Sequence, residues 1–232
     1  MLEIKEKESK VARFAKGYEG MKTLRIAGIL DIVGTAIAEL IVLMSVIQMG
    51  GFGGKEDISS QQVAEAVGGG AMFIFLGFSS MILAIVAYIM QIAGVSEAKN
   101  DDEGFDNALI FIVAGMIVSV VGAFFKGWVG SVLSLTVKVL NVIVIVCMIN
   151  GVRGLAQKSG NEKVDNNGKT VCTVVIVLSV IAILLGFVNV FVPSIELLLT
   201  LISGCMSITK TIVFVVYLCK GIKMLEENKI EG

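Results

Sequence analysis

The sequence of 232 residues contains no histidine and only one proline. Without histidine there are no imidazole general bases, histidine-containing metal sites or Ser-His-Asp triads. No phosphate-binding glycine loop, nucleophile elbow or intramembrane protease signature is present. An enzyme is therefore the least favoured class, and no cofactor is expected. The four cysteines lie inside apolar segments without a Cys-x-x-Cys pair, which indicates small buried hydrophobic residues: Cys147, Cys172, Cys205 and Cys219.

Apolar residues dominate the chain. They make up 56% of it, and the mean hydropathy is +0.89. A water-soluble domain of this length cannot bury so much apolar surface, so the composition indicates a multi-pass membrane protein with the lipid bilayer as its first partner. The net charge is −1 and no patch combines basic with aromatic residues, so a nucleic-acid partner is not expected.

Apolar runs predict an all-α bundle of six transmembrane helices, because each run has about 19 residues or more and a spanning helix needs about 20. The runs are 24–48, 69–93, 107–125, 129–150, 171–192 and 195–219. The third and fourth are separated only by "KGW" (126–128), and the fifth and sixth meet at Pro193-Ser194, a helix breaker. The pattern is that of three successive helical hairpins.

Basic residues predict the orientation. Of 19 lysine and arginine residues, 15 fall in the leader and the first two residues of the first span (through Arg25), in the second and fourth connecting loops and in the tail. The other connecting loops carry only Lys55 and Lys126. By the positive-inside rule both termini are then cytoplasmic. In general style the chain resembles small six-span proteins of prokaryotic cytoplasmic membranes, so a plasma or inner membrane is expected.

The predicted organisation is a charged leader (1–23), a six-span domain (24–219) and a cytoplasmic tail (220–232). "AIA" (36–38) has the form of a signal-peptide cleavage site, but Asp31 interrupts the apolar core of such a signal, which favours an uncleaved first span. Apolar residues at helical spacing make the leader either a helix lying on the inner leaflet or a solvated extension: Ile4, Val11, Phe14, Tyr18 and Met21.

The even-numbered spans end alike, which suggests a parallel three-fold repeat. In each, an apolar helix reaches a glycine and runs on into a polar extension. The endings are "YIMQIAGVSEAK" (88–99), "VCMINGVRGLAQK" (146–158) and "VVYLCKGIKMLEEN" (215–228), with Gly94, Gly151 and Gly221 as the glycines. All three hairpins enter from one side, unlike the inverted repeats of many secondary transporters.

Four charged residues lie deep within the predicted spans, away from the span ends: Asp31, Glu39, Lys138 and Lys210. At 1.5 Å per residue, Asp31 and Lys210 both lie about 10 Å from the inner boundary, Glu39 about 22 Å and Lys138 about 16 Å. These depths suggest that the first span packs on the fourth and sixth through Asp31–Lys210 and Glu39–Lys138 ion pairs. Both lysines belong to polar stripes, and the stripe residues Ser134, Asn141 and Ser207 complete the candidate set.

This charged quartet has three interpretations. The pairs either fix helix register, line a path for a proton, ion or small solute, or contain lysines that reach toward the interface. Two function classes follow. A non-catalytic membrane subunit or scaffold, bound to another membrane protein or to itself, is the first expectation, and a small channel or carrier is the alternative.

Two loops carry weaker signals. The acidic "NDDEGFDNA" (100–108) offers weak metal candidates in Asp101, Asp102 and Asp106. It lacks a second acidic motif and the calcium-loop spacing, so a cap on the third helix by Asp106 or Asn107 is favoured over metal binding. In the loop 50–70, "DISSQQVAEAV" predicts a short amphipathic helix capped by Asp57 or Ser59. That loop serves as a lid, a partner contact or, the favoured interpretation, a tether.

Overall fold

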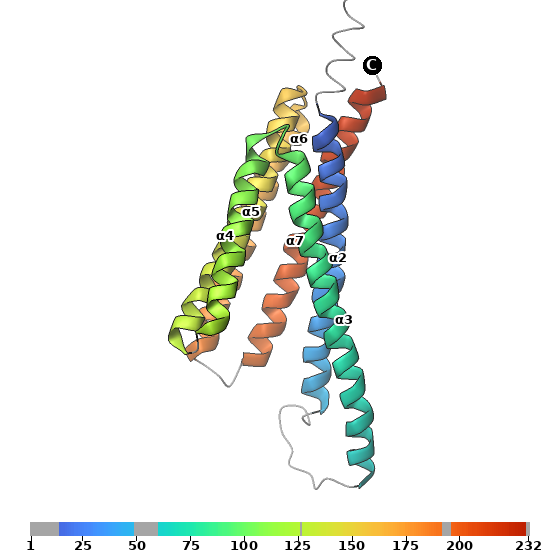
Figure 1. Ribbon diagram of the computed structural model, residues 1–232, viewed down its shortest axis with the longest axis vertical. Coiled ribbons are helices and arrows are strands. Elements are labelled where there is room, and N and C mark those ends of the chain that lie inside the picture. The colour runs from blue at the N-terminus through green and yellow to red at the C-terminus, as the bar shows by residue number, and fades with distance from the viewer. Residues whose placement is uncertain (1–13, 49–59, 126, 192–195, 231–232) are drawn as a thin grey trace, which may run out of the picture.

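The computed structural model describes residues 14–48, 60–125, 127–191 and 196–230, and this part of the chain is helical with no strand. This confirms the all-α prediction for the described residues. Figure 1 shows the six helices. They are α2 (Ala15–Gln48), α3 (Ser60–Ala98), α4 (Glu103–Phe124), α5 (Trp128–Lys158), α6 (Glu162–Phe191) and α7 (Glu196–Ile230).

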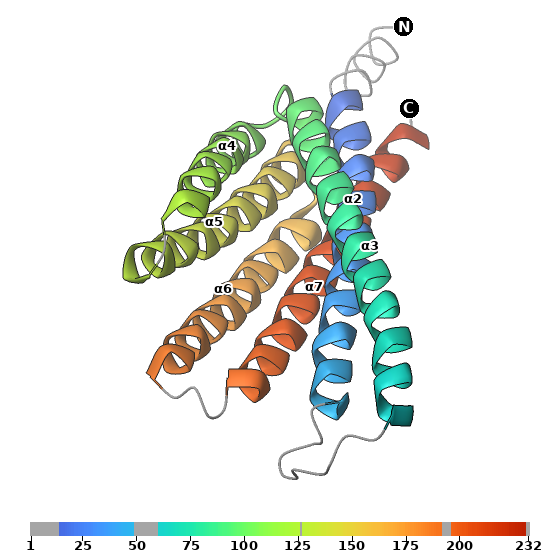
Figure 2. The same ribbon diagram turned by 60° about the horizontal axis from the view of Figure 1, so that its bottom comes forward.

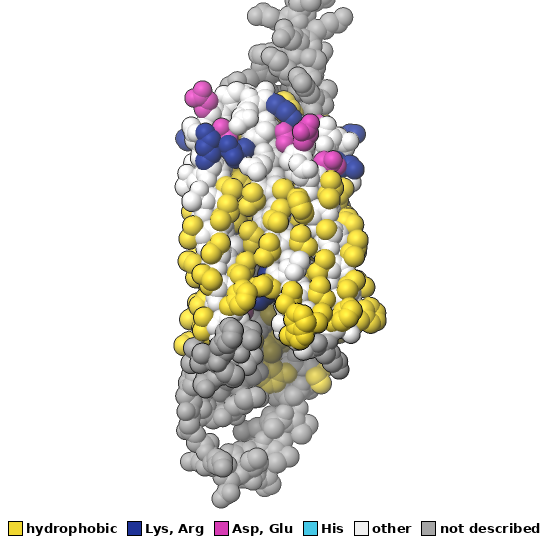
Figure 3. Space-filling view, turned by 90° about the vertical axis from the view of Figure 1, so that its left-hand side faces the viewer, with side chains coloured by type: hydrophobic (Ala, Val, Ile, Leu, Met, Phe, Trp, Pro, Cys, Tyr) yellow, Lys and Arg dark blue, Asp and Glu magenta, His cyan; other side chains and the backbone are white. Residues whose placement is uncertain are grey.

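All six helices are long and apolar enough to cross a bilayer. The shortest, α4, has 22 residues, which is about 33 Å at 1.5 Å per residue and matches a hydrocarbon core of about 30 Å. On the face drawn in Figure 3, hydrophobic side chains form a broad band, and charged side chains gather at one end of it. The chain is a multi-pass membrane protein.

Each helix lies beside its neighbour in sequence, and α2 also packs along α7 (Figures 1 and 2). The described part of α2 begins, and α7 ends, at the same end of the molecule, called here the terminal end. At the opposite or far end, the pair α4–α5 diverges from α2 and α3 (Figure 2). The bundle is therefore tight at one end and splayed at the other.

The packed core lies at the terminal end. Every helix contributes to it, since each carries apolar residues where it approaches or leaves that end. The most deeply buried of these side chains are Met21, Leu24, Val95, Phe105, Met148, Val152, Leu155, Val175, Tyr217 and Leu218. Burying one such side chain contributes about 1.5–3 kcal/mol where it leaves water. In lipid, close packing takes over that role.

Glycines allow the helices to approach at this end. A Cβ on Gly94 of α3 would lie 2.8 Å from the carbonyl oxygen of Gly20 in α2, and one on Gly221 of α7 would lie 2.8 Å from Val152. A Cβ on Gly151 of α5 would overlap the Phe105 ring. The three glycines at which the predicted repeat aligns are thus all close-packing positions.

The residues after these glycines are also equivalent. Val95, Val152 and Ile222 directly follow them, and all three are buried. Three positions further on, Ala98, Leu155 and Leu225 are buried as well. Each even-numbered span therefore presents the same Gly-Val/Ile-x-x-apolar face to the core, which gives the weak sequence repeat a structural basis.

Part of the leader lies in this core rather than on a membrane surface. Within the described residues, α2 begins at Ala15 and Met21 is fully buried. The Tyr18 hydroxyl donates a hydrogen bond to Glu226 Oε1 at 2.7 Å, which ties α2 to α7. The prediction of a leaflet-bound or solvated leader is therefore wrong for these residues. Ile4 and Val11 lie outside the described residues.

Two local predictions are corrected. The N-cap of α4 is Asp102, whose Oδ1 accepts from the Gly104 amide at 2.9 Å, and not Asp106 or Asn107. The helix starts earlier than its apolar run because the cap chemistry lies there. The segment from Ser60 is the first part of α3 and not a separate short helix. Asp57, Ser59 and Pro193-Ser194 lie outside the described residues.

Candidate functional site

Three cavities lie between the helices. The Asp31 cavity, of about 250 Å³, is bounded by α2, α3, α5 and α7. The Glu39 cavity, of about 290 Å³, lies between α2, α5, α6 and α7. The lysine chamber, of about 180 Å³, lies between α5, α6 and α7 and contains both Lys138 and Lys210.

The three cavities adjoin one another. The Asp31 cavity shares Asn141, Ser207 and Lys210 with the lysine chamber. The chamber shares Lys138, Ser203 and Ser207 with the Glu39 cavity. All four members of the charged quartet therefore line this group of adjoining cavities, called here the connected space. The depth-matched partners face the same cavity: Asp31 with Lys210, and Glu39 with Lys138.

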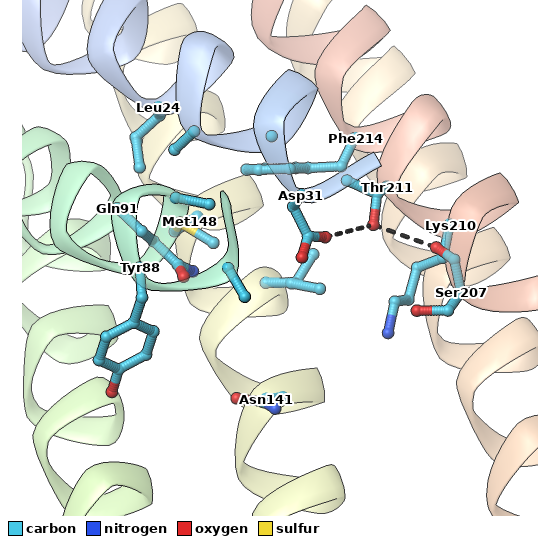
Figure 4. A pocket seen from close by; sticks show the side chains of 15 residues that line it. Leu24, Asp31, Tyr88, Gln91, Asn141, Met148, Ser207, Lys210, Thr211 and Phe214 are labelled. Carbon is cyan, nitrogen blue, oxygen red and sulfur yellow. Dashed lines mark hydrogen bonds between the residues drawn. The ribbon is translucent and has the colours of Figure 1, made fainter. Parts of the chain in front are cut away.

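Asp31 is held by a threonine of α7. Thr211 Oγ1 donates to Asp31 Oδ2 at 3.3 Å and also lies 3.0 Å from the Ser207 carbonyl oxygen (Figure 4). Lys210 attracts Asp31 electrostatically across this cavity. Gln91 of α3 points into the same space (Figure 4). The carboxylate is thus positioned by one hydroxyl with an amide and an ammonium nearby.

Glu39 lies against bare backbone on α7. A Cβ on Gly204 would overlap the Glu39 carboxyl group, so any side chain there would force the acid to move. Glu39 Oε2 is buried and accepts no hydrogen bond from a described residue. A buried acceptor without a partner is costly, about 1–3 kcal/mol, which makes this oxygen a candidate site for a proton or a cation.

The predicted ion pairs are not formed. Among the described residues, neither Lys138 nor Lys210 makes an ion pair with a carboxylate. The first span does pack on the sixth, since α2 runs along α7, and Gly28 closely contacts Val215. However, α2 and α5 form no extensive interface, and the cavities separate Glu39 from Lys138. The charged groups therefore face one another across cavities and do not form ion pairs at a helix–helix interface.

The connected space is closed toward the terminal end and open farther from it. Leu24, Met148 and Phe214 line the part of the Asp31 cavity nearest the terminal end, and these side chains are nearly inaccessible, at 1%, 1% and 5%. By contrast, Asp31, Lys138 and Asn141 are exposed although they lie between helices. Figure 3 shows a patch coloured for lysine or arginine within the hydrophobic band.

The three remaining candidate residues do not all lie at the cavities. Asn141 and Ser207 line the connected space, whereas Ser134 is exposed on α5 and lines none of these three cavities. Ser179 of α6, absent from the candidate set, lines the lysine chamber and is buried with no hydrogen-bond partner among the described residues. The sequence signal that identifies it is a stripe of small and polar residues at helical spacing in the fifth predicted span: Cys172, Ser179, Ala182, Gly186 and Asn189. Thr211 carries no such signal, since a threonine in an apolar run is common.

The acidic loop has structural contacts instead. Asp102 pairs with Lys158 at 2.8 Å, and Asp101 Oδ2 accepts from the Gly17 amide. Among the described residues no group of three or more His, Cys, Asp or Glu side chains is placed to hold a metal. The weak metal candidates Asp101 and Asp102 thus tie α4 to α5 and α2. Asp106 is exposed in the first turn of α4.

The connected space combines charges of both signs, amides and hydroxyls inside the membrane-spanning region. Such a lining can replace part of the hydration shell of an ion or small polar molecule. No protein-family model, curated protein or solved structure matches the chain. The chemistry of these cavities is therefore the basis on which a function is inferred.

Proposed function

We propose that this chain is a small membrane carrier or channel that moves an ion or small polar solute through the three connected cavities. The observation that supports it is the position of Asp31, Glu39, Lys138 and Lys210 on the walls of one open space. Had the quartet served only to fix helix register, its charges would be expected to meet in a packed core.

The cost of these charges supports a role beyond packing. An ionisable side chain near the middle of a bilayer costs roughly 2.5–3.5 kcal/mol on insertion scales, unless it is paired or hydrated. None of the four forms an ion pair with a described residue, and Asp31 alone accepts a hydrogen bond from one, Thr211. Hydration within the cavities is therefore the main compensation. Water and a hydrated solute can use the same space.

The proposed topology gives the path a direction. With three helical hairpins in a plasma or inner membrane and both termini cytoplasmic, the terminal end faces the cytoplasm. The cavities then open toward the outside, and the apolar closure at Leu24 and Met148 lies on the cytoplasmic side. The described arrangement corresponds to an outward-open state whose cytoplasmic closure must loosen for transport.

Reconstitution into vesicles tests this proposal. Purified protein is assayed for flux of protons, sodium, chloride and glycerol against protein-free vesicles. We expect at least one flux above background, lowered about tenfold or more by Glu39→Gln and by Lys138→Met. Lys223→Met, at an exposed lysine paired with Glu227 on α7, is the matched control and should leave flux unchanged. If folded protein moves none of the four probes, the proposal is wrong.

A membrane subunit or scaffold is the second candidate. The divergence of α4–α5 from α2–α3 at the far end favours it, because α3 and α4 pack against each other less extensively than the other sequence neighbours do (Figure 2). Extraction in a mild detergent followed by mass spectrometry separates the two candidates. A stoichiometric membrane partner supports the subunit, and protein that purifies alone while moving a solute supports the carrier.

A further inference from the structure

We infer that the lysine chamber is a binding site for a small monovalent anion, such as a halide, nitrate or short carboxylate. This inference rests on the proposed function, for which it names the solute class. The chamber shares three lining residues with each of the other two cavities, so it adjoins both of them.

The charged residues that line the chamber are both positive, Lys138 and Lys210. Its polar residues are Lys138, Asn141, Ser179, Ser203, Ser207 and Lys210, and no carboxylate is among its lining residues. Two ammonium groups, one amide and three hydroxyls can all donate hydrogen bonds. Asp31 and Glu39 line only the adjoining cavities. A cation would find two like charges here, whereas an anion would find donors from α5, α6 and α7.

A buried serine provides the independent observation. Ser179 is 3% exposed, its hydroxyl has no hydrogen-bond partner among the described residues, and it lines this chamber. A buried hydroxyl normally has a partner. Serine and threonine hydroxyls within helices often donate to the carbonyl oxygen four residues earlier, as those of Thr173 and Thr209 do here. The Ser179 hydroxyl makes no such bond and remains available to a ligand in the chamber.

Charge balance favours a monovalent anion. Lys138 and Lys210 together balance Asp31 and Glu39, so the four residues sum to zero when all are ionised. One added negative charge is stabilised by the two nearby ammonium groups, while the flanking carboxylates limit how tightly it is held. A divalent anion would double both the attraction and the repulsion, but its dehydration cost rises with the square of its charge. The volume of about 180 Å³ also suits a small anion with a few water molecules.

Chloride binding to detergent-purified full-length protein tests the inference, with broadening of the chloride NMR line as the readout. We expect broadening that saturates and that nitrate and acetate reverse by competition. Lys138→Met and Lys210→Met should each weaken binding about tenfold or more, and Ser179→Ala about tenfold, since a hydrogen bond to a charged group is lost. Lys138→Arg and Lys210→Arg keep the charge and should bind within a few fold of the parent.

The controls are matched by residue type. Ser134→Ala removes an exposed hydroxyl from α5 outside the chamber, and Lys223→Met removes a surface ammonium. Both should leave chloride binding unchanged. Absence of saturable broadening in the parent protein overturns the inference. So does broadening in Lys138→Met and Lys210→Met that equals that of the parent.

The flux measurements separate the two proposals. Flux of sodium or protons without chloride binding overturns the anion site and leaves the carrier proposal standing. Saturable chloride binding with no flux of any probe supports the anion site and overturns the carrier proposal. Chloride binding together with chloride flux, both lost in Lys138→Met and kept in Lys223→Met, supports both.

Discussion

Replacement of Gly204 by alanine tests the Glu39 cavity at the level of single atoms. The added methyl group would overlap the Glu39 carboxyl group, which lies directly against the backbone of α7. Overpacking of this kind costs about 1–3 kcal/mol. Replacing a helical glycine with alanine by itself stabilises the folded state by about 0.5–1 kcal/mol. We therefore expect a net destabilisation of about 1 kcal/mol for Gly204→Ala, within a range of about 0–2.5 kcal/mol.

The same structure supplies the control. Gly77 of α3 is helical, and a Cβ there would meet nothing within 4 Å. Gly77→Ala should therefore be neutral or stabilise by up to about 1 kcal/mol. At about 2–4 °C per kcal/mol for a chain of this size, the two variants should melt on opposite sides of the parent or differ by several degrees.

A second substitution identifies the clash. Glu39→Asp shortens the acid by one methylene and draws its carboxyl group away from Gly204. Combined with Gly204→Ala it should recover most of the lost stability, with a coupling of about 1 kcal/mol in a double-mutant cycle. Thermal melting in detergent, monitored as the loss of monodisperse protein, gives the stability of the parent, of the two single variants and of the double variant. If Gly204→Ala is as benign as Gly77→Ala, the placement of Glu39 against α7 is refuted.

Two further predictions concern the terminal end. Gly104→Ala should sharply lower the yield of folded protein, because its Cβ would overlap the backbone of Gly151, while Gly115→Ala, with its nearest atom at 3.9 Å, should be tolerated. Fluorescence-detected size exclusion compares the two, and equal yields would contradict the packing described. Asp102→Ala should cost about 1 kcal/mol through loss of the α4 cap, and Lys158→Ala less than about 1 kcal/mol, because its side chain is 43% exposed. Thermal melting measures both, and the reverse order would be inconsistent with capping by Asp102.

Much of this architecture could be predicted from hydropathy and helix geometry. The six apolar runs predict the six helices, because lipid leaves an unpaired backbone few alternatives to the helix. The depth argument, based on a rise of 1.5 Å per residue, matches Asp31 with Lys210 and Glu39 with Lys138, and each of these pairs lines one cavity. Depth alone cannot give the distance across the membrane plane, so the predicted ion pairs were wrong.

The neighbours of each helix were the least predictable part. Hydropathy does not distinguish a side chain that faces lipid from one that faces another helix, since both are apolar. The helices pack most closely through glycine contacts at the terminal end, whereas α2 and α5 form no extensive interface and leave the cavity between Glu39 and Lys138. Those contacts bring Gly20 against Gly94 in one helix pair and Gly104 against Gly151 in another. Single glycines in the sequence do not reveal their partners.

Some functional side chains also lacked a distinctive signal. Ser179 was visible only as one member of a small-residue stripe, and its unpartnered hydroxyl emerges from the packing of α6 against α5 and α7. Ser134 belongs to the stripe of Lys138 and yet lies outside the cavities. A helical stripe about three to four residues in period covers a broad face, and its edges turn toward lipid.

The account depends most directly on whether solvent reaches Lys138 from the far end while the core near Met148 stays closed. Single cysteines at these two positions, introduced after replacement of the four native cysteines by serine or alanine, can be tested in oriented vesicles with a charged, membrane-impermeant thiol reagent. We expect rapid labelling of Lys138→Cys from the side opposite the termini and protection of Met148→Cys. Protection of both positions from that side, in folded protein, would contradict an open polar path through the bundle.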